Sequence, residues 1–425
     1  MRHLSYPRGI ERRHLVEWFR QGRARSREIF AIPKAECYYD RPIKLRNPIV
    51  FYEGHLPAFA VNTLIKLALK QKPVDPDYEV LFERGIDPGS EDSAKPTSDY
   101  WPRRDEVQAY GAEAERRIER ALCADDIERD DVPQLVDGQA AIAILEHEQM
   151  HQETLLYMLH EMPYEKKVAR RPLHPSRVPG PGSRDLGSVK IPAGIVTLGA
   201  GDHFAWDNEL PSHQIEVPAF EIDRHNVSNG QYLDYMKATG ANPPHFWKRM
   251  NGEWYWRGMF DLVPLPLDAP VYATQEEATA YAKWRGMRVP TEGEYHRAAF
   301  GTPSDEERLW PWGNEPPDPT RGNFGFANWD PVPVGSYPTG ASAWGVHDLV
   351  GNGWEWTSTP FGGFDGFQPM ASYPNYSADF FDGQHFVLKG GSPATAPELI
   401  RRSFRNWFRG NYPYVYATFR CARAT

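Results

Sequence analysis

Apolar and polar residues in the first part of the chain follow the three- and four-residue spacing of amphipathic helices. This spacing places the apolar side chains on one face of each helix, where they can pack against a neighbour. Four such segments, joined by polar connections, predict a helical bundle. The predicted helices cover residues 9–30, 55–71, 104–123 and 139–162.

The second half has another pattern, in which short apolar–polar alternations are separated by turn residues. Residues 189–200 and 213–223 alternate as strands do, and residues 275–286 have helical spacing. Of the 14 tryptophans, 12 lie after residue 200, and glycine and proline are dense in the stretches 311–326 and 360–370. This half therefore predicts an irregular mixed domain, and the whole chain an α+β fold.

A stretch rich in proline, glycine and basic residues, 172–185, separates the two patterns. Such a composition is typical of a linker. We therefore expect a helical domain at 1–171 and a mixed domain at 186–425.

Composition narrows the class of protein. The chain has 425 residues and a net charge of −9, which disfavours nucleic acid as a partner. No apolar run approaches the roughly 18 residues that a membrane span needs, and no apolar segment follows the basic N-terminus as in a signal peptide. Three widely spaced cysteines favour a reduced, cytoplasmic protein without a disulfide framework. The sequence indicates no oligomeric state.

Two histidines lie on one predicted helix, in the segment HEQMH. His147 and His151 are four residues apart, so both imidazoles can reach one metal ion. The segment also satisfies the zinc-peptidase motif, in which Glu148 would be the general base. His55 is the candidate third ligand on a helical segment, and three histidines suit zinc and iron(II) equally. Histidines in less protected contexts are His3, His14 and His160.

The phrases GHLPAF and HEQMHQE resemble the DinB-like helical domain of the ergothioneine-biosynthesis sulfoxide synthases. The second half resembles the formylglycine-generating-enzyme fold, which is similar to C-type lectins. The phrases that carry this resemblance occur in order: IPAGIVTLGA, EIDRHNVSNGQYLDYM, RVPTEGEYHRAAFG, WPWGNE, AWGVHDLVGNGWEWT, VLKGGSPAT and TFRCAR. The formylglycine enzymes hold copper with a cysteine pair. This half has only Cys421, so that activity is not expected.

The resemblance implies a non-haem iron(II) held by His55, His147 and His151. It implies O2-dependent joining of a cysteine sulfur to C2 of the hercynine (trimethylhistidine) imidazole, giving hercynylcysteine sulfoxide in ergothioneine biosynthesis. A structural Ca²⁺ is a further cofactor that loop-rich domains of this kind hold, although no acidic loop here has EF-hand spacing.

The same resemblance assigns substrate-binding residues. Asn406, followed by Trp407, matches the family's asparagine that contacts hercynine. Gln149 lies one step before the position at which the family has a glutamine. Arg103 and Arg104 lie in a segment that resembles the family's arginine-bearing loop, and we expect at least one of them to clamp the carboxylate of the thiol.

Two positions depart from the family pattern. Synthases that use γ-glutamylcysteine have an aspartate where this chain has Phe408, which favours free cysteine as the thiol. The loop STPFGGFDGF, where the family's proton-donating tyrosine is expected, contains none. Tyr100 is our candidate for this catalytic role. The next candidates for this role are Tyr412, Tyr414 and Tyr416.

Alternatives remain from other classes. The thiol could be γ-glutamylcysteine, or the histidines could hold zinc in a DinB-like thiol transferase or a peptidase. A non-enzymatic lectin-like binding module would leave the three histidines without a role.

Overall fold

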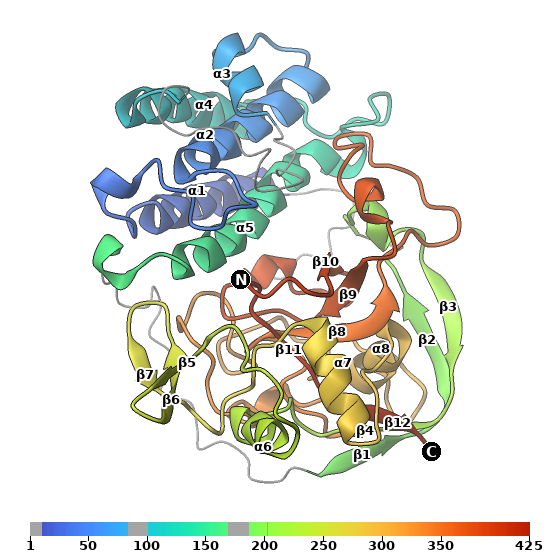
Figure 1. The fold of residues 1–425 in the computed structure, drawn as a ribbon. Coiled ribbons are helices and arrows are strands. Elements are labelled where there is room, and N and C mark those ends of the chain that lie inside the picture. The colour runs from blue at the N-terminus through green and yellow to red at the C-terminus, as the bar shows by residue number, and fades with distance from the viewer. Residues whose placement is uncertain (1–10, 84–100, 169–186, 202) are drawn as a thin grey trace. The chain divides into compact units, whose positions relative to one another are not determined.

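The computed structural model describes residues 11–83, 101–168, 187–201 and 203–425 (Figure 1). Their contacts divide into two compact units. The helical unit contains the described residues up to Val168 together with Met370–Pro374. The mixed unit contains the described residues from Gly187 to Pro369 and Asn375–Thr425. The predicted linker, 172–185, lies outside the described residues.

The helical unit is built around the long helices α1, α2, α4 and α5 (Figure 1). Three of them, α1, α4 and α5, agree closely with predicted segments. Helices α1 and α2 each contact both α4 and α5. Shorter elements connect them. The helices and helical turns are α1 (Arg12–Ile29), η1 (Ala35–Cys37), α2 (Ile49–Ala60), η2 (Val61–Ala68), α3 (Pro76–Leu81), α4 (Arg104–Ala124), η4 (Val136–Gly138), α5 (Gln139–His160) and η5 (Tyr164–Lys166).

Helix α5 lies in the interior of this unit. Every side chain from Ala140 to Leu145 is buried, and so are the polar Glu146, His147 and Glu148 that follow. A helix that is apolar on all sides is buried on all sides. His147 therefore lies away from solvent, whereas His151 is partly exposed.

Helix α2 begins at Ile49, so the predicted start at residue 55 was wrong. The first turn is apolar and buried throughout, and an unbroken apolar run shows no helical periodicity. Pro57 lies inside the helix and removes one backbone donor. Beyond Ala60 the backbone widens into the π-helix η2, at whose end the Leu69 N–H bonds to the Leu64 carbonyl at 3.0 Å.

The mixed unit contains four small sheets among long loops (Figure 1). Their strand orders are β1-β4-β12, β10-β9-β8-β11, β2-β3 and β5-β6-β7, and only β11 and β8 pair in parallel. The strands are β1 (Ser188–Ile191), β2 (Gly194–Leu198), β3 (His213–Val217), β4 (Phe220–Asp223), β5 (Trp247–Met250), β6 (Glu253–Arg257), β7 (Leu262–Pro264), β8 (Trp354–Pro360), β9 (His385–Lys389), β10 (Asn406–Arg409), β11 (Ala417–Thr418) and β12 (Ala422–Ala424).

Three helices of this unit begin at capping boxes. Ser228, Thr274 and Thr291 each accept a bond from the backbone N–H three residues on, which satisfies a donor that the first turn leaves free. The helices are α6 (Asn229–Thr239), α7 (Gln275–Trp284) and α8 (Glu292–Phe300), with short turns η6 (Asp207–Glu209), η7 (Pro338–Gly340), η8 (Ala378–Phe380) and η9 (Pro397–Leu399).

Tryptophans and ion pairs are buried together in the mixed unit. Trp354 and Trp356 of β8 are fully buried, and the Glu355 between them forms an ion pair of 2.6 Å with the equally buried Arg420. These large side chains fill an interior that has little regular structure. No described helix has the length and apolar character that crossing a bilayer requires.

Candidate metal centre

Helices α2 and α5 bring His55, His147 and His151 together. One ligand atom from each lies within 4.8 Å of the others. The distances between ring centroids are 5.1 Å for His55–His147, 4.9 Å for His55–His151 and 4.4 Å for His147–His151. Within the described part of the chain, no other group of histidine, cysteine, aspartate or glutamate residues offers such an arrangement.

The environment keeps these imidazoles neutral. Burial lowers the pKa of His55 to about 4 and lowers the pKa of His147 and His151 well below the usual 6.5. Neither ring nitrogen of His147 nor Nδ1 of His151 has a hydrogen-bond partner among the described residues. Buried polar atoms normally have a partner, and neutral imidazole nitrogens are good ligands for iron(II) and zinc. The donor set therefore fits a divalent metal ion.

His55 differs from the other two because the protein orients its ring. Its Nδ1 lies 2.8 Å from the carbonyl oxygen of Phe82. A carbonyl only accepts hydrogen bonds, so Nδ1 carries the proton and Nε2 presents its lone pair.

Glu148 takes part in an ion-pair network between α5 and α1. Its Oε1 accepts hydrogen bonds from Arg23 Nη1 at 2.9 Å and from Ser26 Oγ at 2.6 Å, and all three residues are buried. A carboxylate held in this way is not available to activate a water molecule at the metal. The geometry therefore argues against the peptidase activity that the HEQMH motif suggested.

Aromatic rings cover the histidine cluster. Phe59 stacks on His147 with centroids 3.5 Å apart, and Phe51 stacks on His55 at 5.0 Å. Tyr373 packs against Phe59 at 5.0 Å and lies 6.2 Å from the ring of His147. These contacts exclude water from one side of the cluster.

Tyr373 belongs to the segment Met370–Pro374, which follows β8 by ten residues of sequence yet belongs to the helical unit. The Ser372 N–H donates to Gln139 Oε1 at 3.2 Å, and Gln134 Nε2 donates to the Ala371 carbonyl at 3.5 Å. The predicted tyrosine-bearing loop, STPFGGFDGF, ends at Phe367 and so does not include Tyr373. Tyr373 lies farther along the same connection between β8 and β9, so the sequence of the whole connection indicates it as a candidate.

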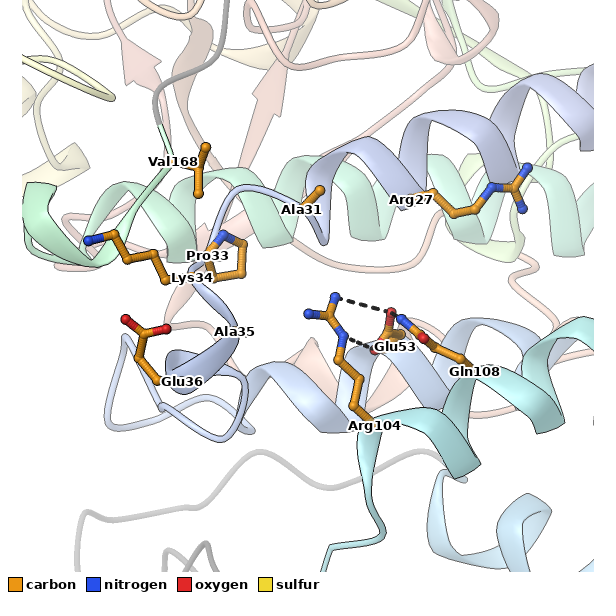
Figure 2. A pocket seen from close by; sticks show the side chains of 10 residues that line it. All are labelled: Arg27, Ala31, Pro33, Lys34, Ala35, Glu36, Glu53, Arg104, Gln108 and Val168. Atoms are coloured by element: carbon orange, nitrogen blue, oxygen red, sulfur yellow. Dashed lines mark hydrogen bonds and ion pairs between the residues drawn. The ribbon is translucent and has the colours of Figure 1, made fainter.

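The predicted arginines contact protein groups. Arg103 has an exposed side chain that pairs with Asp105 at 3.0 Å. Arg104 pairs with Glu53 at 3.3 Å, donates to the Phe30 carbonyl at 2.9 Å and lies over the ring of Tyr38. Arg104 and Glu53 line a pocket of about 630 Å³, and their side chains point toward each other (Figure 2).

Glu53 lies two positions before His55, so the two side chains leave α2 in opposite directions. The pocket of Arg104 is thus on the other side of α2 from the ring of His55. A role of either arginine as a carboxylate clamp stays a prediction.

The predicted residues of β10 lie in the mixed unit. Alternation along a strand places Asn406 and Phe408 on one face and Trp407 on the other. Trp407 stacks on Phe361 at 4.3 Å and meets Tyr376 edge-on at 5.2 Å, while Phe408 stacks on Tyr412 at 5.3 Å. Their substrate contacts stay predictions.

The other candidates lie as follows. Gln149 is buried in α5 between the two metal-facing histidines. Tyr416 is buried against Tyr272, and Tyr414 packs on His245. His14 is half exposed and lies beside Glu11, and His160 is buried at the end of α5. Tyr100 and His3 lie outside the described residues. The structural Ca²⁺ stays a prediction.

Several known proteins are similar to this chain. The model of the sulfatase-modifying factor enzyme 1-like domain matches residues 178–425. The hercynine oxygenase of Mycobacterium tuberculosis is 34% identical over 313 residues, which cover 68% of this chain and 73% of that protein. The chain belongs to the ergothioneine-biosynthesis sulfoxide synthase family.

One of the other relatives covers more of the chain, and another covers less. Ergothioneine biosynthesis protein 1 of Neurospora crassa is 30% identical and covers 92% of this chain. The chain spans 55% of that relative's length. The formylglycine-generating enzyme of Bos taurus is 29% identical over 45% of this chain. The prediction of a formylglycine-generating-enzyme-like second domain is confirmed, whereas the DinB-like character of the first stays a prediction.

Proposed function

We propose that this protein is an iron(II)- and O2-dependent sulfoxide synthase that joins the sulfur of cysteine to C2 of the hercynine imidazole. The observation that carries the proposal is the cluster of His55, His147 and His151 in a chain of this family. These three neutral nitrogens would hold iron(II), which when bound supplies the one-electron chemistry that O2 requires.

The reaction balances without an external reductant. Hercynine loses the hydrogen on C2 and the thiol loses its proton as the C–S bond forms, which releases two electrons. Oxidation of the sulfur to the sulfoxide releases two more. The four electrons reduce O2, of which one oxygen atom remains on sulfur and the other leaves as water.

Two features of the helical unit support this assignment. Phe59 and Tyr373 cover the histidines, which limits the access of water to a reaction that consumes O2. Tyr373 is also our candidate, in addition to Tyr100, for the residue that gives a proton to the reacting oxygen. A Tyr373→Phe variant should keep its metal affinity and lose most of its sulfoxide formation.

Cysteine is the proposed thiol because Phe408 offers no charge to a glutamyl ammonium group. Its ring stacks on Tyr412. Free thiols at Cys37, Cys123 and Cys421 agree with a reduced, cytoplasmic location, which is part of the same proposal.

The test is anaerobic loading of the metal-free protein with iron(II), followed by O2 uptake with hercynine plus cysteine and, separately, plus γ-glutamylcysteine. We expect uptake only when hercynine and a thiol are both present, with cysteine the faster thiol. A faster reaction with γ-glutamylcysteine would overturn the choice of thiol. No uptake with either thiol, together with tight zinc binding, would replace the proposal by a zinc-dependent thiol transferase.

A further inference from the structure

The residue before His55 is a glycine that lies against the ring of Phe82. A Cβ added at Gly54 would lie 2.5 Å from three ring carbons of Phe82, including the one at the tip. Real Cβ atoms do not approach so closely, so a side chain at residue 54 and the Phe82 ring cannot both occupy their places. Gly54 has an ordinary helical backbone, and its contact with this ring is therefore what requires a glycine.

Phe82 is the residue whose carbonyl orients His55. It caps the C-terminus of α3, its N–H bonds to the Tyr78 carbonyl at 2.9 Å, and its side chain is fully buried. Its ring stacks on Trp101 at 6.1 Å and lies 6.4 Å from Phe51. The ring is enclosed by Trp101 and Phe51, so a displacement that its side-chain torsions cannot absorb moves the backbone carbonyl that accepts from His55 Nδ1.

Among the described residues, His55 is also the member of the cluster whose ring is oriented by a hydrogen bond to a backbone carbonyl. Neither ring nitrogen of His147 nor Nδ1 of His151 has a hydrogen-bond partner among the described residues, and the two rings pack against Phe59 and Tyr52. The bond of 2.8 Å from His55 to Phe82 decides which nitrogen of His55 faces the cluster.

We propose that Gly54 is a positioning residue for the metal site. By leaving room for the Phe82 ring against α2, it keeps the Phe82 carbonyl on His55 Nδ1 and so directs Nε2 toward a metal ion. The inference rests on the proposed metal site and does not depend on the identity of the thiol or on turnover.

The first test uses the unaltered, metal-free protein labelled with ¹⁵N-histidine. We expect the nitrogen spectrum to show His55 as the Nδ1–H tautomer, assigned by comparison with His55→Gln. An Nε2–H tautomer would overturn the proposal, and this measurement requires no variant at residue 54 to fold.

The second test is Gly54→Ala, with Gly111→Ala as the matched control. Gly111 also lies in a long helix of this unit, but a Cβ there would meet only Pro57, at an ordinary 3.8 Å. Affinity for Co²⁺ is measured by competition with a chelator, and folding by circular dichroism. We expect a loss of about 10- to 100-fold in Gly54→Ala, the range for lost support of a metal ligand, and no change in Gly111→Ala.

A rescue variant separates the proposed mechanism from a general disturbance of α2. Leucine at residue 82 lacks the distal ring carbons that the new methyl group would meet and keeps the backbone carbonyl. Gly54→Ala combined with Phe82→Leu should therefore regain Co²⁺ affinity and the Nδ1–H tautomer. Full affinity in Gly54→Ala alone, an equal loss in Gly111→Ala, or no recovery in the folded double variant would each overturn the role of Gly54. Because no readout uses substrate, a failure here is distinct from a failure of the proposed reaction.

Discussion

The buried ion pair between Arg23 and Glu148 provides a sharp test of how α5 is held. The side chains are 8% and 7% exposed, and their atoms approach to 2.9 Å. Removing one partner of a buried pair typically costs about 3–5 kcal/mol, because the other charge stays buried without compensation. The two single variants should differ within this range, since the partners that remain are different.

Glu148→Gln leaves Arg23 with Glu115, which it contacts at 2.8 Å, so we expect a loss near the lower limit of about 3 kcal/mol. Among the described residues, Arg23→Met leaves the Glu148 carboxylate with the hydroxyl of Ser26 alone, at 2.6 Å, so we expect a loss near the upper limit of about 5 kcal/mol. The double variant should lose about 2–3 kcal/mol less than the sum of the two, because the interaction they share is counted once.

The assay is urea unfolding of the metal-free protein, with hydrogen exchange of α5 peptides reporting the free energy of opening of that helix. The control pair is Arg20 and Glu119, which joins α1 to α4 at 2.5 Å but is 58% and 36% exposed. Its coupling should be much smaller than that of the buried pair, because solvent screens the interaction between exposed charges. A coupling for Arg23–Glu148 no larger than that of the control would refute the reasoning. Loss of a hydrolytic activity in Glu148→Gln, with unchanged unfolding, would instead restore Glu148 as a catalytic base.

Three further predictions concern the metal, the thiol and pH. His151→Ala should abolish metal retention, measured by metal analysis, and leave the near-ultraviolet circular dichroism of the tryptophan-rich mixed unit unchanged. Phe408→Asp should shift the ratio of kcat/KM about tenfold toward γ-glutamylcysteine, since the new carboxylate can pair with the glutamyl ammonium group; an unchanged ratio would exclude residue 408 from thiol selection. Glu209 is fully buried, which by itself raises its pKa, but Arg401 at 2.5 Å and a bond from a serine hydroxyl outweigh burial and hold the pKa below the usual 4.5. The contribution of the ionised Glu209 to stability is therefore present above pH 4.5 and is lost as pH falls through the folded-state pKa. Glu209→Gln should lower the free energy of unfolding by about 3 kcal/mol at pH 7 and by progressively less below pH 4.5. A difference between the two proteins that does not change with pH would contradict this.

Several elements could be predicted from local pattern because their cause is local. The helices that became α1, α4 and α5 follow from apolar spacing, and their ends lie close to the predicted ones. The start of α2 could not be predicted in this way, because its first turn is buried on every side and carries no polar positions to mark a face.

The candidate metal site likewise has a part that local sequence predicts and a part that it does not. The spacing of His147 and His151 places both on one face of a helix whatever surrounds it, because four residues make about one turn. Their approach to His55 depends on the packing of α2 against α5. That packing results from contacts between segments about 90 residues apart, which no window of sequence displays.

The sequence by itself determined the family of this protein, the type of its second domain and the histidine pair on α5. Each of these follows from short segments of residues that are close together in the sequence. Only the tertiary structure decided that Glu148 faces Arg23 rather than the metal, that Tyr373 joins the helical unit, and that Gly54 accommodates the ring of Phe82. The physical reason is that helix periodicity depends on backbone geometry over a few residues. Which groups meet across the interior depends instead on how whole helices and loops exclude water and fill space.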